Sequence, residues 1–286
     1  MSRQGNSANE DYAFACEQFA FVIDGSSGLT SKKYTDRESD AQWFSHSLGI
    51  LLQTRLHDIG KPIKDIVSEI TNELCTQFKR FLAGAEYDLL DMPSACLSVL
   101  RAKGDKIEFF QLGDCVTIIL KTNGEIDVFL DDSVLKLDNA VVSNVLKISR
   151  EKSIPYADAL IYGKEQLIHN RKKLNTPGGY EILELIGAGI EHAYTSNFSG
   201  YNIKAVSILS DGFAEIVDLY ELYDYKTLMN KMETCDLNLL CDELFAAQNK
   251  DYTMGKYPRL KHRDDSSAVW CGINPLAYNK NTGIRT

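Results

Sequence analysis

Two long amphipathic segments stand among groups of short apolar runs, and this order is the strongest constraint on the fold. Apolar residues recur at helical spacing over about 38–59 and again over 62–81, which predicts two long helices. The other runs are short, mostly apolar and bounded by turn residues, and therefore predict strands. The predicted strands are two short ones within 12–24 on either side of Glu17-Gln18, followed by 94–102, 107–112, 115–120, 125–130, 205–209 and 267–273.

The arrangement of these elements predicts an α+β fold in a single domain. Lys103-Gly104-Asp105 and Asn123-Gly124 are hairpin signals, so the four strands within 94–130 are expected to form one antiparallel meander. Helical patterns return over 213–250. Antiparallel strands interrupted by paired helices favour a layered sandwich, and no repeat or linker divides residues 1–286. The stretch 139–198 is mostly helical and polar and predicts a surface flap.

Composition excludes several classes of function. A formal net charge of -9 and a pI near 5.1 disfavour nucleic-acid binding, which needs clustered Lys and Arg. The seven cysteines form no CxxC pair and the five histidines no HExxH motif, which disfavours disulfide frameworks and zinc sites. The first residues are polar and the longest apolar runs, such as 116–120, are too short to span a bilayer. We therefore expect a cytoplasmic protein that binds neither membranes nor nucleic acid.

Acidic residues recur at the edges of the predicted strands. They occur as Glu10-Asp11, Asp24-Gly25, Gly113-Asp114, Asp211-Gly212 and Asp264-Asp265. If these edges converge, the carboxylates need cations, because like charges at short range raise one another's pKa. Mg²⁺ and Mn²⁺ prefer oxygen ligands, and a pair of such ions activates water for attack on phosphorus. Glycines after the aspartates would allow sharp turns close to the ions. A single Asp-Gly pair is also an ordinary turn signal, so spacing alone leaves both interpretations open.

The order of six short motifs resembles that of a known family. These motifs are Asn9-Glu10-Asp11, VIDGSSG at 22–28, PSAC at 93–96, QLGDC at 111–115, LSDGF at 209–213 and DDSS at 264–267. Together they look like the successive motifs of protein phosphatase 2C enzymes, and most nearly those of compact bacterial members. The resemblance implies a four-layer α-β-β-α sandwich, with two packed antiparallel sheets flanked by helix pairs. It also implies Mn²⁺- or Mg²⁺-dependent phosphatase activity on phosphoserine and phosphothreonine in proteins.

The resemblance implies a role for each acidic motif. Two ions, and a weaker third, would be held by Glu10, Asp24, the Gly25 carbonyl, Asp114, Asp211 and Asp264. Asp24 would bridge the two main ions, Asp211 and Asp264 would hold the first, and Glu10 with Gly25 would hold the second. Asp114 would serve the third ion, and Asp11 would orient the attacking water. The catalytic set is thus Asp11, Asp24 and Asp211, and residues 131–203 would form a variable flap beside the site.

Three positions depart from the family pattern. Asn6 stands where many members carry a phosphate-binding arginine, and an amide cannot replace the charge and bidentate grip of a guanidinium. Ser26 replaces the histidine of eukaryotic members, so no side chain stands out as general acid. Asp265 replaces an asparagine and adds a negative charge that could tune metal affinity. Three arginines could bind phosphate from another direction, although surface positions are expected for them: Arg3, Arg37 and Arg171.

Three functions are compatible with this pattern. The first is an active protein serine/threonine phosphatase with phosphoprotein substrates and a cognate kinase. The second, motivated by Asn6, is a weakly active or inactive member that serves as a binding or regulatory module. The third is a phosphatase of a small phosphorylated metabolite, for which an altered phosphate pocket would be an adaptation.

Overall fold

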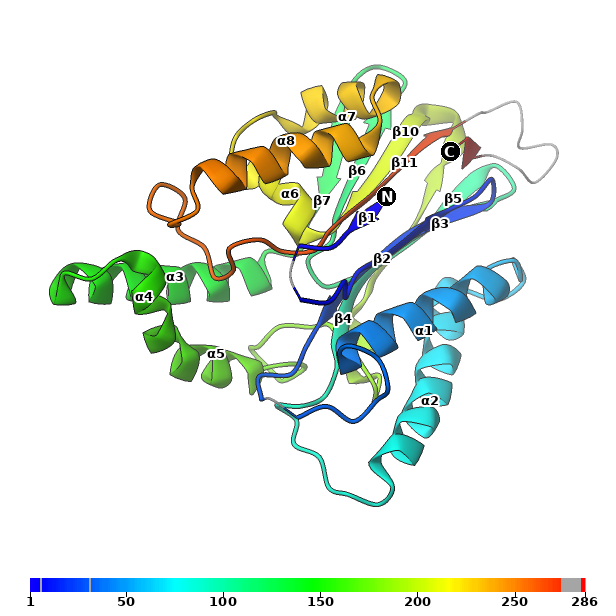
Figure 1. Cartoon of the computed structure of the whole chain (residues 1–286). Coiled ribbons are helices and arrows are strands. Elements are labelled where there is room, and N and C mark those ends of the chain that lie inside the picture. The colour runs from blue at the N-terminus through cyan, green and yellow to red at the C-terminus, as the bar shows by residue number, and fades with distance from the viewer. Residues whose placement is uncertain (6, 31, 274–283, 286) are drawn as a thin grey trace.

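Two antiparallel β-sheets form the centre of the molecule (Figure 1). The computed structural model describes residues 1–5, 7–30, 32–273 and 284–285. In the first sheet the strand order is β2-β3-β4-β5-β9, and β8 pairs with β4. The strands of this sheet are β2 (Tyr12–Ala15), β3 (Phe19–Ser26), β4 (Ser94–Lys103), β5 (Lys106–Leu112), β8 (Leu183–Glu184) and β9 (Tyr194–Ser199).

The second sheet has the order β1-β11-β10-β6-β7, and β12 pairs with β11. Its strands are β1 (Ser2–Arg3), β6 (Val116–Lys121), β7 (Ile126–Phe129), β10 (Ile203–Leu209), β11 (Ser266–Ile273) and β12 (Ile284–Arg285). All pairings in both sheets are antiparallel.

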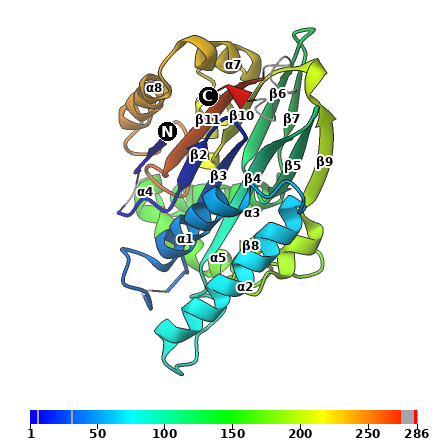
Figure 2. The same cartoon turned by 90° about the vertical axis from the view of Figure 1, so that its right-hand side faces the viewer.

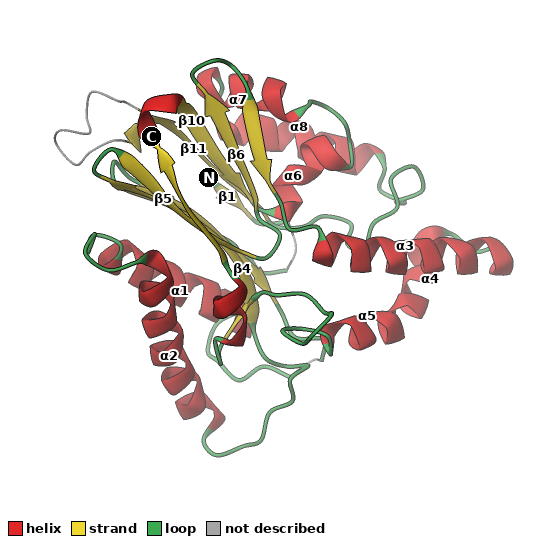
Figure 3. Ribbon diagram, turned by 180° about the vertical axis from the view of Figure 1, so that it is seen from behind, coloured by secondary structure: helices red, strands yellow, loops and turns green. Residues whose placement is uncertain are grey.

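Helices cover the outer face of each sheet, so the fold has four layers (Figure 3). The first sheet is covered by α1 (Asp40–Arg55) and α2 (Ile63–Leu82), which cross in front of it in Figure 2. The second sheet is covered by α6 (Asp211–Asp218), α7 (Tyr225–Thr234) and α8 (Leu237–Lys250). This arrangement confirms the predicted α+β sandwich.

A further group of helices projects from one end of the sandwich (Figure 1). It consists of α3 (Ser133–Lys152), α4 (Tyr156–Ala159) and α5 (Lys164–Arg171), with a 3-10 turn, η1 (Leu160–Gly163), between the last two. The remaining 3-10 turns are η2 (Ala188–His192) and η3 (Gly200–Asn202). Among the helices of the described residues, none combines the length and apolar character needed to cross a membrane.

Strand β3 is apolar throughout residues 19–23 because both of its faces are buried. Phe19, Phe21 and Ile23 point to the core shared with α1 and α2, whereas Ala20 and Val22 point to the core between the sheets. All of these side chains are buried, because successive strand residues face opposite sides and both sides are covered. Burying each large side chain contributes roughly 1.5–3 kcal/mol, so this strand anchors the first sheet.

The four strands within 94–130 do not form the single meander that the sequence predicted. β4 and β5 pair in the first sheet, whereas β6 and β7 pair in the second. The chain crosses between the sheets at Gly113, which has φ +89 and lies so close to Cys96 that an added Cβ would be 2.4 Å from its Sγ. The apolar pattern of two hairpins is the same whether or not they share a sheet, so periodicity could not reveal this crossing.

The stretch predicted as a mostly helical flap also contains two strands. Helices extend only to the end of α5, after which β8 and β9 pair with β4 and β5. β9 reads Tyr-Thr-Ser-Asn-Phe-Ser and is largely exposed at the sheet edge. An exposed edge strand needs few apolar residues, which is why the sequence did not predict a strand here.

Arg101 joins the first sheet to the turn between α1 and α2. Its side chain is fully buried and its guanidinium donates to the carbonyls of Leu56 (3.3 Å), Asp58 (2.9 Å) and Lys61 (2.6 Å). It also pairs with the Glu108 carboxylate at 2.6 Å. Buried carbonyls and charges need hydrogen-bond partners, and the Arg101 side chain supplies them for three carbonyls of the turn between α1 and α2.

We expect Arg101→Met to lower the free energy of unfolding by about 3–5 kcal/mol, because it leaves Glu108 and three carbonyls without their partner. Urea unfolding followed by circular dichroism measures this loss. As a control, Arg55→Met removes the pair with Glu73, whose side chains are 33% and 40% exposed, and should cost less than about 1 kcal/mol. Similar losses for the two variants would contradict the proposed role of Arg101.

Candidate active site

Two of the predicted site residues are brought to one rim by the pairing of β10 with β11. Asp211 follows β10, and Asp264 lies just before β11. Because the two strands are antiparallel, the end of one lies beside the start of the other. The junction is fixed by two hydrogen bonds of 2.9 Å, from Ser210 N–H to the Ser267 carbonyl and from Ser267 N–H to Ser210 Oγ.

Asp24 reaches the same rim from the other sheet. It lies inside β3, opposite Cys96 of β4, rather than at the end of the strand as predicted. The backbone N–H of Asp211 donates to Asp24 Oδ2 at 3.3 Å, although the two residues are 187 positions apart. Asp114 lies on the crossing turn between β5 and β6. We call Asp11, Asp24, Asp114, Asp211 and Asp264 the acidic centre.

The carboxylates of the acidic centre strongly affect one another. Burial raises the pKa of Asp24 well above its usual range, and the neighbouring charges of Asp211, Asp11 and Asp114 raise it further. Burial, followed by repulsion from Asp211, raises the pKa of Asp114 to about 7. Burial, together with repulsion from Asp265, also raises the pKa of Asp11. Such a set stays ionised at neutral pH only when cations compensate it.

The donor chemistry of the acidic centre fits hard divalent cations. The available ligand atoms are carboxylate oxygens, which Mg²⁺ and Mn²⁺ prefer. Asp11 is 2% exposed, and its Oδ2 has no hydrogen-bond partner in the described part of the chain. The described residues contain no group of three or more His, Cys, Asp or Glu side chains that is already arranged to hold an ion.

Glu10 and Gly25 lie against each other beside the acidic centre. The Glu10 carboxylate accepts a hydrogen bond from Ser27 Oγ, and a Cβ on Gly25 would lie 2.3 Å from the Glu10 carbonyl oxygen. A Cβ on Gly212 would likewise lie 2.1 Å from the Asp265 carbonyl oxygen. Neither glycine has a positive φ: Gly25 lies inside β3, where no sharp turn forms, and Gly212 lies at the start of α6, where the chain changes from strand to helix. The glycines are needed because neighbouring backbone approaches them closely.

Asp265 fixes the N-terminal segment that leads to the acidic centre. It is 5% exposed and accepts hydrogen bonds from the N–H groups of Gly5 at 2.8 Å and Glu10 at 2.7 Å. The carboxylate that replaces the family's asparagine therefore positions the backbone beside Asp11. An amide oxygen could accept the same hydrogen bonds, but it would not add the charge that raises the pKa of Asp11.

The structure adds two charged residues that sequence reasoning missed. Lys261 Nζ donates to both carboxylate oxygens of Asp264, at 2.9 and 2.7 Å. The second is Asp138 of α3, where burial and then repulsion from Asp211 raise its pKa to about 6. Neither residue lies in a motif, so only the tertiary arrangement could reveal them.

None of the arginines considered as a substitute phosphate ligand contacts the acidic centre. Arg171 is 8% exposed rather than on the surface as expected, and its guanidinium donates to the carbonyls of Met92 (3.0 Å) and Ser27 (3.2 Å). Arg3 pairs with Asp242 at 2.5 Å, and Arg37 is exposed. Asn6, where the family pattern has an arginine, lies outside the described residues.

A family model described as protein phosphatase 2C matches residues 2–239. The chain belongs to the protein phosphatase 2C family. It is therefore a hydrolase of the protein phosphatase type, and enzymes of this type use Mn²⁺ or Mg²⁺. No curated protein matches the sequence significantly.

Solved structures of bacterial phosphatases share the fold. The serine/threonine phosphatase PstP/Ppp of Mycobacterium tuberculosis is 14% identical with a TM-score of 0.53, and the match covers 94% of this chain and 95% of that one. PppA of Pseudomonas aeruginosa is also 14% identical, with a TM-score of 0.53 and 94% of each chain covered. Stp1 of Staphylococcus aureus is 11% identical with a TM-score of 0.54, covering 96% of this chain and 93% of that one.

We expect Asp114→Asn to stabilise the metal-free protein. Because folding raises the pKa of Asp114 from 3.8 to about 7, the ionised carboxylate destabilises the folded state, and this cost grows as pH rises between those values. The variant should therefore gain at least about 1 kcal/mol over the parent protein at pH 7 and almost nothing at pH 4.

Urea unfolding in the presence of a chelator measures this difference. Asp105→Asn is the matched control, since Asp105 is exposed on the hairpin between β4 and β5 and should change little at either pH. A stability gain that is independent of pH would rule out ionisation of the buried Asp114 carboxylate as its cause.

Proposed function

We propose that the acidic centre is the catalytic site and that it hydrolyses phosphoserine and phosphothreonine in proteins. One observation carries this proposal: Asp24 and Asp211 approach each other from different sheets. The backbone N–H of Asp211 donates to Asp24 Oδ2 at 3.3 Å. Carboxylates are seldom buried together unless a function requires it, because their mutual repulsion costs stability.

Each carboxylate has a proposed task. Asp24 would bridge two ions, with Asp211 and Asp264 on the first and Glu10 with the Gly25 carbonyl on the second, while Asp114 would serve a weaker third ion. When bound, the ions acidify water and neutralise charge on the phosphoryl oxygens. The Asp11 Oδ2 atom is buried and without a partner in the described residues, so it can accept a hydrogen bond from the attacking water and hold it in line with phosphorus.

The flap would help to choose the substrate. We propose that residues 131–203 act with the rest of the chain as a single domain, and that α3 to α5 form one wall of the site. Asp138 of α3 supports this placement, because its pKa responds to Asp211 and Asp264. Arg171 at the end of α5 ties the flap to the carbonyls of Ser27 and Met92.

The cellular setting follows from the chemistry. A phosphatase of phosphoproteins needs a kinase that makes its substrates, so a cognate kinase is the proposed functional partner. All seven cysteines lie in the described residues and are unpaired, which supports a reducing compartment such as the cytoplasm.

Purified protein with Mn²⁺ should hydrolyse an aryl phosphate and phosphoserine or phosphothreonine peptides, and should lose this activity in excess chelator. Asp24→Asn and Asp211→Asn should each lower kcat at least about a hundredfold, because they remove ligands on which charge stabilisation depends. Asp127→Asn, on the exposed hairpin of β6 and β7, is the control and should keep full activity.

The substrate screen separates the alternatives. Turnover of small phosphorylated metabolites but not of phosphopeptides would favour the metabolite phosphatase. Tight Mn²⁺ binding by calorimetry without turnover of any phosphate ester would favour a binding or regulatory module and would refute catalysis at the acidic centre.

A further inference from the structure

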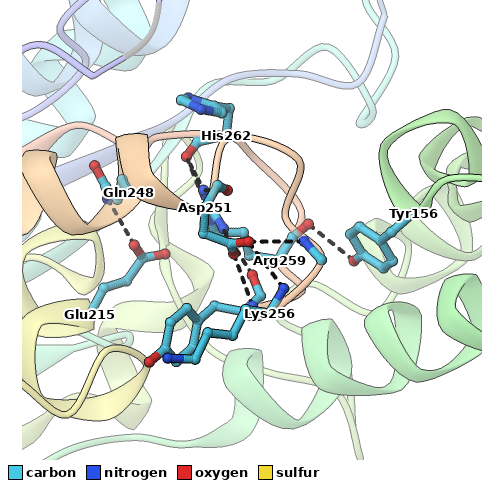
Figure 4. Close-up of polar contacts among 9 residues, drawn as sticks. Tyr156, Glu215, Gln248, Asp251, Lys256, Arg259 and His262 are labelled. Carbon is cyan, nitrogen blue, oxygen red and sulfur yellow. Dashed lines mark hydrogen bonds and ion pairs between the residues drawn. The ribbon is translucent and has the colours of Figure 1, made fainter.

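The loop between α8 and β11 has a fixed internal structure. Asp251 and Arg259 form an ion pair of 3.1 Å, and their side chains are only 9% and 6% exposed (Figure 4). The Asp251 carboxylate also accepts the backbone N–H groups of Gly255 (3.1 Å), Lys256 (3.0 Å) and Tyr257 (2.9 Å). A buried ion pair with this many hydrogen bonds stabilises one loop geometry, because breaking it would leave a buried charge unpaired.

The same ion pair fixes the backbone on both sides of Lys261. The guanidinium of Arg259 donates to the carbonyl of His262 at 3.0 and 2.9 Å. From the flap, Tyr156 Oη donates to the Arg259 carbonyl at 3.0 Å, as Figure 4 shows. Met254 also packs with Val141 of the flap. The backbone at Lys261 is therefore held by both the loop and the flap.

This loop directs the Lys261 ammonium into the acidic centre. Nζ lies 2.9 and 2.7 Å from the two carboxylate oxygens of Asp264. The carboxylates of Asp211 and Asp24 also attract it electrostatically. Lys261 is therefore an ion-pair partner of Asp264. Its side chain is still 51% exposed, so the ammonium can be approached from solvent.

The other cations of this loop are committed elsewhere. Arg259 forms an ion pair with Asp251 and donates hydrogen bonds to backbone carbonyls. Arg263 donates to Gln248 Oε1 at 3.2 Å and to Asn249 Oδ1 at 2.9 Å. Lys256 Nζ lies over the ring of Tyr257, 4.7 Å from its centroid. Among the basic side chains of this loop, Lys261 is the one that pairs with a carboxylate of the acidic centre.

We propose that Lys261 binds the phosphoryl group of the substrate, an inference that rests on the proposed phosphatase function. A phosphate ester carries up to two negative charges and must enter a centre that is itself rich in carboxylates. A lysine ammonium is a compact cation with three N–H donors on a flexible stem, and it binds phosphate as a point charge. With the oxygens of Asp264 engaged as metal ligands, the three N–H donors of Lys261 would be free to bind the phosphoryl oxygens.

Binding of inorganic phosphate to the Mn²⁺-loaded protein tests this role without relying on turnover. In Lys261→Met the dissociation constant of phosphate should rise roughly tenfold to a hundredfold, the worth of one charged hydrogen bond. KM for an aryl phosphate should rise with it, and Lys261→Arg should restore part of both. Lys256→Met is the matched control on the same loop and should leave both constants unchanged.

A second measurement separates phosphate binding from a simple charge effect. Without phosphate, Lys261→Met should bind Mn²⁺ more tightly than the parent protein, because the ammonium no longer competes for Asp264. Tighter Mn²⁺ binding with an unchanged dissociation constant for phosphate would overturn the proposal and leave Lys261 as a counter-ion of Asp264. If the parent protein binds Mn²⁺ but hydrolyses nothing, the proposed function fails, and the phosphate measurement still decides the role of Lys261.

Discussion

Repulsion among carboxylates gathered at one rim of the sandwich is the constraint on which the rest of the structure depends. Asp24 and Asp114 come from the first sheet and its crossing turn, whereas Asp211 and Asp264 come from the second sheet. Burial raises the pKa of Asp24, and its neighbours raise it further, which shows how costly the arrangement is without cations. Burial of apolar side chains in the cores around the two sheets must outweigh that cost. A bound cation would instead attract the carboxylates and remove their mutual repulsion.

Two buried arginines support the site from outside the acidic centre. Arg171 connects the flap to the carbonyl of Ser27, which follows Asp24, and to that of Met92, which precedes β4. Arg259 fixes the loop that carries Lys261 and leads to Asp264. Both guanidinium groups are buried and donate to backbone carbonyls. Their role is to hold backbone, and a guanidinium suits this role because its planar donors satisfy several carbonyls at once.

Local periodicity predicted most of the helices and strands, whereas the four layers with two packed sheets were implied by the family resemblance. The apolar spacing of α1 and α2 and the runs in β3, β4 and β10 needed no tertiary knowledge. The motifs also selected the aspartates that the structure gathers at one rim, although their roles as ligands stay predictions. The misses share a cause, since each depends on partners distant in sequence. The sheet change at Gly113, the polar edge strand β9, the buried Arg171 and the pair of Lys261 with Asp264 are all set by neighbours that no local pattern reveals.

The split of the acidic centre between the two sheets also matters while the protein is being made. Asp11 and Asp24 leave the ribosome early, but Asp211 and Asp264 are translated near the end, and Asp264 is placed only when β11 pairs with β10. A nascent chain that lacks β11 also lacks the strand that places Asp264 beside Asp211, so it cannot assemble the complete set of carboxylates. Synthesis therefore delays the site until the second sheet is complete, so truncated translation products carry no finished centre.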